Sequence, residues 1–546
     1  AMYREELQKV DWSYVYLESN PNTAYNAFYN IIYSLLNRIF PVKRLATKSN
    51  NTNSWITNGI KKSCKRKCEL HHLKLRGFID KDYYNYYCKV LKNVIMDAKR
   101  MSNAAMIKNS RNKSKTIWTL VNSYMKRNTT QVSLIHNLNN HNNNVDVKDA
   151  LNSINHFFLN QGLASKLTNS DYYPTEDQCN KSLFMSPTNS IEVFNVINSL
   201  ANTTSTGEDE IPVKLLKFVA HEISDPLTDI INKTVIEATF PDKLKIAEIK
   251  PIHKKGSKCN FENYRPIALL SNISKIFEKI YYKRISEYFE NNNLLVNVQN
   301  GFRSNKSTTR AIYQALSKII TSLNCGKQTA MMCLDLTKAF DTVNHQILIQ
   351  KLEMYGVRGI PLQLIKSYLN GRTQCVIDYY MGQKVKSNKL PISKGIPQGS
   401  ILGPLFYLIY ANDLVLYSES FSVQFADDTN VIISESSCED LNKSIERNLQ
   451  KLQHWCRLNH FQLNDNKTII LKFNYKSDTD CDISTQNQSV PPAKNKTKFL
   501  GLWIDTKLNW KEHINILSSE ISKYCFALKM LSNSAPPEVA MMAYTG

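Results

Sequence analysis

The sequence predicts a mixed α/β (α+β) fold that is divided into more than one domain. The chain has 546 residues, of which 42% are hydrophobic, so it is long enough to bury several cores. Residues 1–130 carry apolar side chains mainly at helical spacing. From about residue 188 onward, amphipathic helical segments alternate with short strand-like runs. These observations predict a helical N-terminal extension followed by a larger α/β region.

The charge balance indicates a polyanionic partner. The chain holds 69 Lys and Arg residues against 47 Asp and Glu residues, which gives a formal net charge of +22. An excess of this size favours binding to nucleic acid or to an anionic membrane surface over a role in solubility alone. No apolar run approaches the roughly 18 residues of a membrane span, and no secretory leader is visible. We therefore expect a nucleic acid partner and no membrane.

The N-terminal region concentrates this positive charge. A helix is expected over residues 78–101, and KKSCKRKCELHHLKLR (61–76) before it holds seven Lys and Arg residues against the single Glu69. The segment is a good electrostatic footprint for phosphates, although a solvated helix face is an equally good interpretation. The Asn-rich stretch HNLNNHNNNVD (136–146) is typical of a linker.

The cysteines predict neither a disulfide framework nor a zinc module. Cys64, Cys68 and His71 or His72 fall on one helical face, as metal ligands do, but their intervals match no common zinc module and their neighbours are cationic. Zinc is therefore the disfavoured alternative there. The twelve cysteines have no repeating framework, and we interpret them as free thiols in a reducing compartment.

Two adjacent acids stand in the otherwise core-like segment SVQFADDTNVIIS (422–434). Val423 and Phe425 alternate with polar residues and an apolar run follows, so the pattern predicts a β-hairpin with Asp427 and Asp428 at its tip. A solvated turn is the alternative interpretation, because Asp is a common turn residue. Two unpaired carboxylates this close repel each other and are costly to desolvate. The position of the pair therefore has to be explained by other parts of the sequence.

A third carboxylate lies at the end of another predicted strand. In MMCLDL (331–336) the pleat places Asp335 on the face opposite Leu334 and Leu336, and a helix follows until Gly356. For Asp335 alone, a helix-capping or ion-paired acid is the alternative. If the two strands are neighbours, three carboxylates converge. Oxygen ligands of this kind suit Mg²⁺, which shares its coordination shell with substrate phosphates.

The assembled motifs resemble those of reverse transcriptases. LDLTKAFD (334–341), GIPQGSILGP (395–404) and FADD (425–428) follow one another in the order of that family's palm motifs. Flanking segments narrow the resemblance to the polymerases of non-LTR retrotransposons, most closely the jockey-like elements of animals. These segments are NYRPIALLSNISKIFEKI, QNGFRSNKSTTRAI, NKTIILKF and KFLGLWIDTKLNW. The resemblance covers roughly residues 190–515.

This resemblance implies a right-hand polymerase with fingers and palm, an antiparallel palm sheet, a helical N-terminal extension and a partial thumb. The implied boundaries are 1–135 for a basic helical extension or connector, 136–189 for a linker and the start of the fingers, 190–505 for fingers and palm with the core at about 232–505, and 506–546 for a truncated start of the thumb.

The resemblance also implies a catalytic centre. Asp335, Asp427 and Asp428, together with Leu336, match the positions that hold two Mg²⁺ ions about 3.5–4 Å apart, with Mn²⁺ as a substitute. The repulsion between the acids would then be offset by the cations. Metal binding would then explain why two adjacent acids lie at the tip of the hairpin.

Further residues match the family's nucleotide-binding positions. Lys254, or Lys255 if the loop alignment shifts by one residue, and Arg265 match positions that grip the triphosphate, where an Arg can clamp two phosphate oxygens. Phe340 matches an aromatic plate under the nucleotide sugar, with core packing as the alternative role. Lys467 matches a lysine that protonates pyrophosphate, with a plain surface lysine as the alternative.

The remaining matches concern the backbone path and the nucleic acid. Gln398 and Gly399 match a segment that contacts the nucleotide and lets the backbone approach the template. The positions implied for primer and template contact are Arg303 together with the primer-grip residues Phe499, Leu500 and Gly501.

The implied function is RNA-directed DNA polymerisation that copies element RNA into cDNA, by target-primed reverse transcription. The implied partners are template RNA, a DNA primer or target DNA, and dNTPs. Endonuclease activity is expected from sequence outside this chain, and activity is expected in the nucleus after ribonucleoprotein assembly in the cytoplasm. The alternatives are a catalytically inactive reverse-transcriptase-like RNA-binding protein and an RNA-synthesising polymerase on the same palm, against which Phe340 argues.

Overall fold

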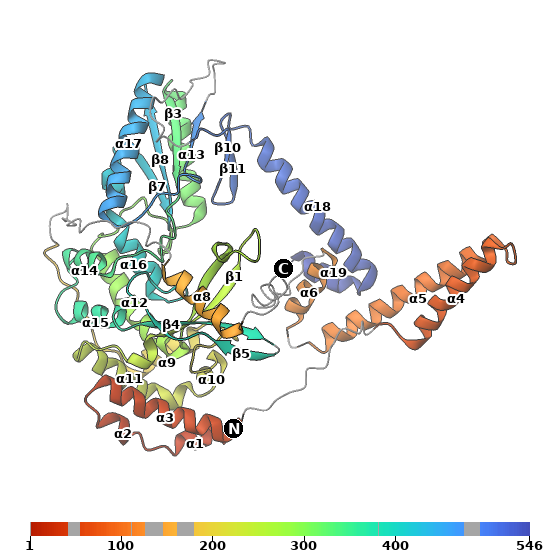
Figure 1. Ribbon diagram of the computed structural model, residues 1–546, viewed down its shortest axis with the longest axis horizontal. Coiled ribbons are helices and arrows are strands. Elements are labelled where there is room, and N and C mark those ends of the chain that lie inside the picture. Colours follow the sequence, from red (N-terminus) through yellow and green to blue (C-terminus); the bar gives the residue numbers. More distant parts are fainter. Residues whose placement is uncertain are drawn as a thin grey trace. The chain divides into compact units, whose positions relative to one another are not determined.

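The chain forms two compact units in the computed structural model. The residues described are 2–41, 55–110, 112–125, 146–160, 179–380, 382–473 and 492–545. Unit 1 contains residues 1–42 and 132–509, and unit 2 contains residues 43–131 and 510–546. The predicted linker at 136–146 lies outside the described residues except for Asp146. Both units therefore combine segments that are far apart in the sequence (Figure 1).

Unit 1 begins with three helices that pack on its main core. They are α1 (Met2–Gln8), α2 (Ser13–Tyr16) and α3 (Pro21–Ile39). Tyr3 and Phe28 are buried in the same apolar cluster as Ile231, and Arg4 forms an ion pair with Glu222 at 2.6 Å. The sequence predicts a single extension over residues 1–135. The structure instead places α1, α2 and α3 in unit 1, because these helices bury their apolar faces in its core.

The other helices of unit 1 surround two sheets. They are α8 (Val147–Asn160), α9 (Ser190–Ser199), α10 (Val213–Phe218), α11 (Ala220–Ile236), α12 (Asn272–Asn291), α13 (Thr308–Asn324), α14 (His345–Met354), α15 (Ile360–Leu369), α16 (Leu402–Tyr410) and α17 (Cys438–Leu458). Helix α16 is apolar on all sides and accordingly buried, as expected of a central helix. The N-cap of α9 is Asn189, whose side chain accepts the Glu192 N–H at 2.9 Å.

The first sheet of unit 1 is mixed. Its strands are β1 (Ile246–His253), β2 (Tyr264–Leu269), β4 (Thr373–Tyr380), β5 (Gln383–Lys386) and β6 (Leu390–Pro391). The order is β2-β1-β4-β5, with β6 also paired to β4. β1 pairs antiparallel with β2 and parallel with β4.

The second sheet is fully antiparallel, in the order β7-β8-β3-β9. Its strands are β3 (Gln328–Leu334), β7 (Phe421–Phe425), β8 (Asp428–Glu435) and β9 (Ile469–Phe473). Helices α13 and α17 lie against it (Figure 1). The interior strands β3 and β8 are buried along most of their length, so their sequences are apolar runs rather than alternating ones.

The last two strands of unit 1 form a separate hairpin. Strands β10 (Lys496–Phe499) and β11 (Leu502–Asp505) pair antiparallel, with Phe499 opposite Leu502. The two loop residues, Leu500 and Gly501, have φ values of 48° and 97°. Two positive φ angles in a two-residue loop match the right-handed twist of the flanking strands, and glycine adopts this backbone without strain.

Unit 2 is helical and combines residues 43–131 with the C-terminal segment 510–546. Its helices are α4 (Asn58–Leu75), α5 (Lys81–Lys108), α6 (Lys113–Tyr124), α18 (Lys511–Ser534) and α19 (Pro537–Thr545). Ile107, Val121 and Leu531 belong to one apolar cluster. Asn103 Nδ2 donates to the Ser534 carbonyl at 2.8 Å. The predicted helix at 78–101 is confirmed within α5, and the segment expected to start a thumb packs with the N-terminal helices.

The cysteines and the hydropathy add two further findings. Within the described ranges most cysteines are free thiols, including Cys64, Cys68 and Cys456. Cys438 is disulfide-bonded, so the prediction of free thiols throughout is wrong at that position. No helix of the described residues is long and apolar enough to span a bilayer.

Candidate active site

The adjacent acids lie at the tip of the predicted hairpin. Phe425 pairs with Asp428, so Ala426 and Asp427 form a two-residue loop between β7 and β8. Ala426 has a φ of 56°, an uncommon backbone conformation for a residue with a side chain. Both Asp427 and Asp428 are exposed although the strand behind them is buried. The hairpin prediction is therefore confirmed, and the acids emerge where the buried strands end.

The third acid lies at the same end of the sheet. β3 and β8 are antiparallel neighbours, with Leu334 opposite Thr429, so Asp335 follows directly beside the hairpin tip. Partial burial of its carboxyl group, followed by the negative charges of Asp427 and Asp335, raises the pKa of Asp428 to about 6. The two strands are thus neighbours, which was the condition for the carboxylates to converge, and the charges of Asp427 and Asp335 both act on Asp428.

Lys467 supplies the positive charge at this point. Its Nζ lies 2.8 Å from Asp335 Oδ2. The segment that carries it is bound to the end of β3 by two backbone hydrogen bonds, from Asn464 N–H to the Asp335 carbonyl and from Thr337 N–H to the Gln462 carbonyl, both at 2.8 Å. These two hydrogen bonds hold the segment with Lys467 beside Asp335.

The donor set at this end of the sheet fits a hard cation. It consists of carboxylate oxygens. The pKa of Asp428 is raised first by burial and then by the negative charges of Asp427 and Asp335, and a bound cation would offset these effects. The two backbone bonds between the end of β3 and residues 462–464 do not use the Leu336 carbonyl. As the side chains stand, no group of three or more His, Cys, Asp or Glu residues in the described ranges is gathered closely enough to hold a metal. Asp335 is instead held by Lys467.

Basic residues of the mixed sheet belong to the same electrostatic neighbourhood. Burial lowers the pKa of Lys254, and the charges of Arg265, Lys467 and Lys255 lower it further, while Asp335 opposes the shift. Lys254 N–H also donates to the Asn263 carbonyl at 2.8 Å, which ties the end of β1 to the start of β2. Lys254 and Arg265 at the ends of β1 and β2 therefore share an electrostatic neighbourhood with Lys467 and Asp335.

Phe340 lies at the edge of the core, with part of its surface exposed. Its ring stacks on Tyr407 with the centroids 4.7 Å apart and meets Phe302 edge to face at 6.3 Å. The backbone carbonyl of Phe340 accepts the Ile396 N–H at 2.8 Å. A ring that is stacked on a neighbour and only partly buried suits the predicted sugar plate and core packing equally.

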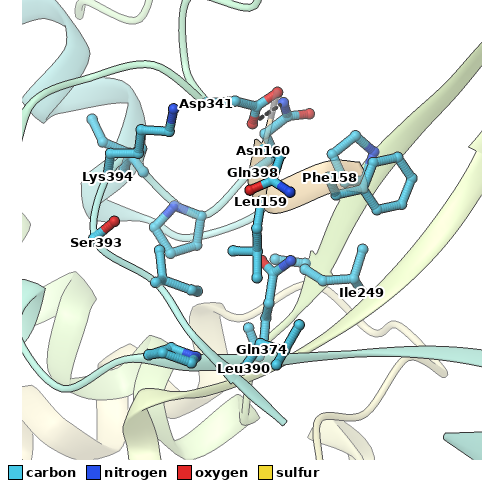
Figure 2. A pocket seen from close by; sticks show the side chains of 18 of the residues that line it. Phe158, Leu159, Asn160, Ile249, Asp341, Gln374, Leu390, Ser393, Lys394 and Gln398 are labelled. Atoms are coloured by element: carbon cyan, nitrogen blue, oxygen red, sulfur yellow. Dashed lines mark hydrogen bonds between the residues drawn. The ribbon is translucent and has the colours of Figure 1, made fainter. Parts of the chain in front are cut away.

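Gln398 is oriented by a half-buried acid. Its Nε2 donates to Asp341 Oδ1 at 2.7 Å, and burial raises the pKa of Asp341 to about 6. Figure 2 shows this pair at one side of a pocket of about 340 Å³ that also contains Phe158, Ile249 and Lys394. Gln398 is thus held in one orientation beside a cavity under the mixed sheet.

Gly399 has a structural reason to be glycine. Its φ is 130°, and a Cβ at this position would lie 2.6 Å from the Ala268 carbonyl oxygen. The Ala268 N–H in turn donates to the Gln398 carbonyl at 2.9 Å. The glycine permits close approach to β2, whereas the predicted approach to a template stays a prediction.

Arg303 has a structural role within the protein. Its guanidinium forms two hydrogen bonds to the Glu290 carboxylate, at 2.6 and 2.9 Å, and a third to the Val296 carbonyl at 2.7 Å. The side chain is 7% exposed. The contact of Arg303 with primer or template stays a prediction, and this geometry does not support it. Of the predicted primer-grip residues, Phe499 is buried, and Leu500 and Gly501 form the hairpin turn described above.

Sequence reasoning missed two residues that organise the site. Gln299 bonds to the backbone of Ala426, next to the paired acids, and Asp341 orients Gln398. Both occur in motifs that the sequence made visible, QNGF and KAFD, so the signal was available. A polar residue inside an apolar motif predicts a buried hydrogen-bond partner without identifying it.

The sequence comparisons relate one segment of the chain to a known family. Residues 252–504 match the family model described as Reverse transcriptase (RNA-dependent DNA polymerase). The matched segment contains the acids, Lys467 and Gln398.

The individual relatives are retrotransposon proteins. The chain is 30% identical over 358 residues to "Probable RNA-directed DNA polymerase from transposon X-element" of Drosophila melanogaster, covering 64% of this chain and 39% of that protein. It is 28% identical over 336 residues to "RNA-directed DNA polymerase from mobile element jockey" of the same species, covering 59% and 36%. The predicted resemblance to jockey-like non-LTR polymerases is confirmed. The chain spans about two fifths of the length of these curated relatives.

Proposed function

We propose that this chain is the RNA-directed DNA polymerase part of a non-LTR retrotransposon protein, which copies element RNA into cDNA. The observation that carries the proposal is the pairing of β3 with β8, which brings Asp335 beside Asp427 and Asp428 inside a segment that matches the reverse transcriptase family. Three carboxylates at one sheet end, faced by cations, suit nucleotidyl transfer, in which catalysis is largely positioning and charge stabilisation.

In this proposal the parts of unit 1 take the roles of a right-hand polymerase. The antiparallel sheet β7-β8-β3-β9 is the palm, and the mixed sheet with β1 and β2 belongs to the fingers. The β10–β11 hairpin is the primer grip. Helices α18 and α19 begin the thumb, and they pack with α5 and α6 of the same unit, as the Asn103–Ser534 contact illustrates.

Asp335, Asp427, Asp428 and the Leu336 carbonyl are the groups that would hold Mg²⁺, with Mn²⁺ as a substitute. Bound there, two such ions would activate the primer hydroxyl and neutralise the triphosphate and the leaving group. The ion pair between Lys467 and Asp335 has to open or rearrange for Asp335 to serve as a ligand, and the freed ammonium is then available to donate a proton to pyrophosphate.

The remaining side chains bind and orient the nucleotide. Lys254 and Arg265 provide positive charge for the triphosphate on the side opposite the acids. Phe340, stacked on Tyr407, presents a rigid ring to the sugar. Gln398, fixed by Asp341, offers an amide of defined orientation to the nucleotide or its template partner.

The proposed substrates are dNTPs, an RNA template and a DNA primer, and the proposed setting is target-primed reverse transcription. The positive charge of the chain favours nucleic acid partners. In this setting the nick that provides the primer is made by an endonuclease from sequence outside this chain.

Primer extension on a defined RNA template tests the proposal. The chain should extend an annealed DNA primer with dNTPs in the presence of Mg²⁺ and use NTPs far less efficiently. Asp427→Asn is the control, because it removes one ligand charge at nearly constant volume. An inactive wild-type chain that still binds RNA would support the alternative of an inactive RNA-binding relative, and preferential use of NTPs would support an RNA-synthesising polymerase.

A further inference from the structure

The hairpin that carries Asp427 and Asp428 is bound along one side by residues 298–302. The Asn300 N–H donates to the Gln424 carbonyl at 2.8 Å, and the Gln424 N–H donates to the Val298 carbonyl at 3.0 Å. Gln299 and Gln424 accordingly form an isolated parallel bridge. The segment therefore extends the pairing of the palm sheet beyond β7, at the point where the strand approaches the acids.

At the turn itself, one side chain replaces this backbone pairing. Gln299 Oε1 accepts the Ala426 N–H at 3.0 Å, and Gln299 Nε2 donates to the Ala426 carbonyl at 3.3 Å. The same Oε1 accepts the Gly301 N–H at 2.8 Å. Gln299 is 4% exposed, so water does not compete freely for these groups. A single amide thus satisfies both polar groups of the residue that precedes Asp427.

Two other features make this contact specific. Ala426 has a positive φ of 56°, a conformation that alanine adopts only when its surroundings hold it there. A Cβ on Gly301 would lie 2.2 Å from the Ala426 nitrogen, so the segment reaches the turn only because residue 301 is glycine. The backbone at residue 301 is therefore in close contact with the backbone at residue 426.

The following residues connect the turn to other parts of the site. Phe302 meets the Phe340 ring edge to face, and Arg303 anchors the segment to Glu290 of α12 through two hydrogen bonds. The anchor fixes the segment with respect to the core. The segment in turn contacts both the acid-bearing turn and the ring proposed to lie under the nucleotide sugar.

We infer that Gln299 is a positioning residue that fixes the backbone of Ala426 and thereby sets where Asp427 and Asp428 present their carboxylates. Gly301 is the residue that allows this approach. The catalytic consequence rests on the proposed function, whereas the structural part does not. Without the two amide bonds the turn would be free to leave its positive-φ conformation, and the carboxylates would spend less time in register with Asp335.

Gln299→Met tests the inference, because Met has similar length but makes neither hydrogen bond. Hydrogen exchange of the Ala426 amide, followed by mass spectrometry on peptides spanning residues 421–430, should accelerate on the order of tenfold. Binding of Mn²⁺, measured by electron paramagnetic resonance, should weaken several-fold. The kcat for primer extension should fall by on the order of tenfold while the KM for dNTPs changes little, and part of the loss should recover at high Mg²⁺.

Gln374→Met is the matched control. Gln374 is a buried glutamine of β4 whose Nε2 donates to Asn155 at 2.9 Å, and it contacts neither strand of the acidic hairpin. The Gln374→Met variant should leave the hydrogen exchange at Ala426 and the Mn²⁺ affinity unchanged. If Gln299→Met does not fold, Gln299→Asn takes its place, since it keeps the amide but is one methylene too short to span the turn.

Unchanged exchange at Ala426 in a folded Gln299 variant would overturn the inference. So would accelerated exchange together with wild-type Mn²⁺ affinity and kcat, because the turn would then be free without effect on the acids. A wild-type chain that fails to extend a primer would refute the proposed function instead, and the exchange and Mn²⁺ measurements would still decide whether Gln299 positions the acids.

Discussion

At the scale of single residues, the site is defined by charges that the folded chain leaves incompletely balanced. Asp428 has a raised pKa beside Asp427 and Asp335, Lys467 is the cation that contacts Asp335, and Lys254 has a lowered pKa within a basic neighbourhood. Perturbations of this kind cluster where chemistry is performed. The three carboxylates and Lys467 lie at the end of the antiparallel sheet, whereas Lys254 lies just after β1 of the mixed sheet. A triphosphate with its cation is the kind of ligand that would balance both groups of charges.

Replacing Asp335 or Asp427 with Asn should lower primer extension by more than about a hundredfold while leaving the melting temperature and RNA affinity nearly unchanged. Each change deletes one ligand charge without altering volume. Asp428→Asn should be somewhat better tolerated, as expected of the less direct ligand in such a pair. Extension rates, thermal melting and RNA binding of the three variants would be compared side by side. Near-normal extension by Asp427→Asn would contradict the carboxylate site.

Asp341 gives a pH dependence of stability with a definite sign. Its pKa is raised by burial from 3.8 to about 6, with the Gln398 hydrogen bond and the charge of Lys338 opposing the shift. The folded chain therefore keeps a proton that the unfolded chain has lost between these values. Stability from this group is largest below pH about 4 and is lost as the pH rises through about 6, by at most about 3 kcal/mol.

Asp341→Asn should remove this loss, because Asn accepts the same hydrogen bond from Gln398 without a charge. We expect the melting temperature of the variant to rise relative to wild type between pH 5 and 7 and the difference to level off above about pH 7.5. Melting curves of both proteins across this range are the measurement. Parallel pH profiles would mean that the carboxyl group is not held neutral by burial.

Phe340 should select against ribonucleotides by steric exclusion of the 2′-hydroxyl. Overpacking of this kind typically costs about 1–3 kcal/mol, or roughly tenfold to a hundredfold in rate. Phe340→Val should relax the selection, with a smaller loss in dNTP use. Single-nucleotide incorporation of dCTP and CTP opposite a template G measures the ratio. An unchanged ratio in Phe340→Val would leave the ring with its packing role on Tyr407 alone.

At the scale of elements, helices hold the motif loops in place. Glu278 of α12 is buried, and its Oε2 accepts the N–H groups of Ile401 and Leu402 at 2.7 and 3.3 Å. It thereby satisfies two of the free N–H groups at the start of α16, directly after the segment with Gln398 and Gly399. One helix supplies the cap of another, and the loop between sheet and helix is fixed as a result.

Glu278→Ala should destabilise unit 1 by about 1–3 kcal/mol, because two buried N–H groups lose their acceptor. Glu278→Gln keeps an oxygen at the same place and should cost less. Urea denaturation of both variants gives the values. Glu287→Ala, at an exposed position of the same helix, is the control and should stay within about 0.5 kcal/mol of wild type. Equal stability of the Ala variants at 278 and 287 would contradict the capping role.

The elements that sequence predicted well are those with a short-range pattern. The β7–β8 hairpin, the strand before Asp335 and the helix within α5 follow from alternation or helical spacing over a few residues. The pairing of β3 with β8 was conditional in the sequence, and only the fold established it. The motifs showed Gln299 and Asp341 as polar residues but not their partners, because hydrogen bonds between residues 127 and 57 positions apart leave no local pattern.

At the scale of the whole molecule, the N-terminal region is divided between two units. Helices α1 to α3 belong to unit 1, whereas α4, α5 and α6 form unit 2 together with α18 and α19. Periodicity alone does not predict this division, since all of these segments are amphipathic helices. Deleting residues 1–130 would therefore remove core residues such as Phe28 from unit 1, and it would remove α5 and α6 from the apolar cluster that they share with α18. Surface substitutions test the basic region more cleanly.

Helix α4 should contribute to RNA affinity through phosphate contacts. Lys61 and Lys65 are exposed one helical turn apart on the same face. Each phosphate contact releases counterions and adds about 0.7 to the slope of log K against log salt for a single strand. Replacing both lysines with Gln should therefore weaken RNA binding at low salt and make the slope shallower by about 1 to 2. Lys214→Gln with Lys327→Gln, two exposed lysines of unit 1, is the charge-matched control and should leave the slope unchanged. Equal slopes for the α4 variant and wild type would mean that the basic face of α4 is only solvated.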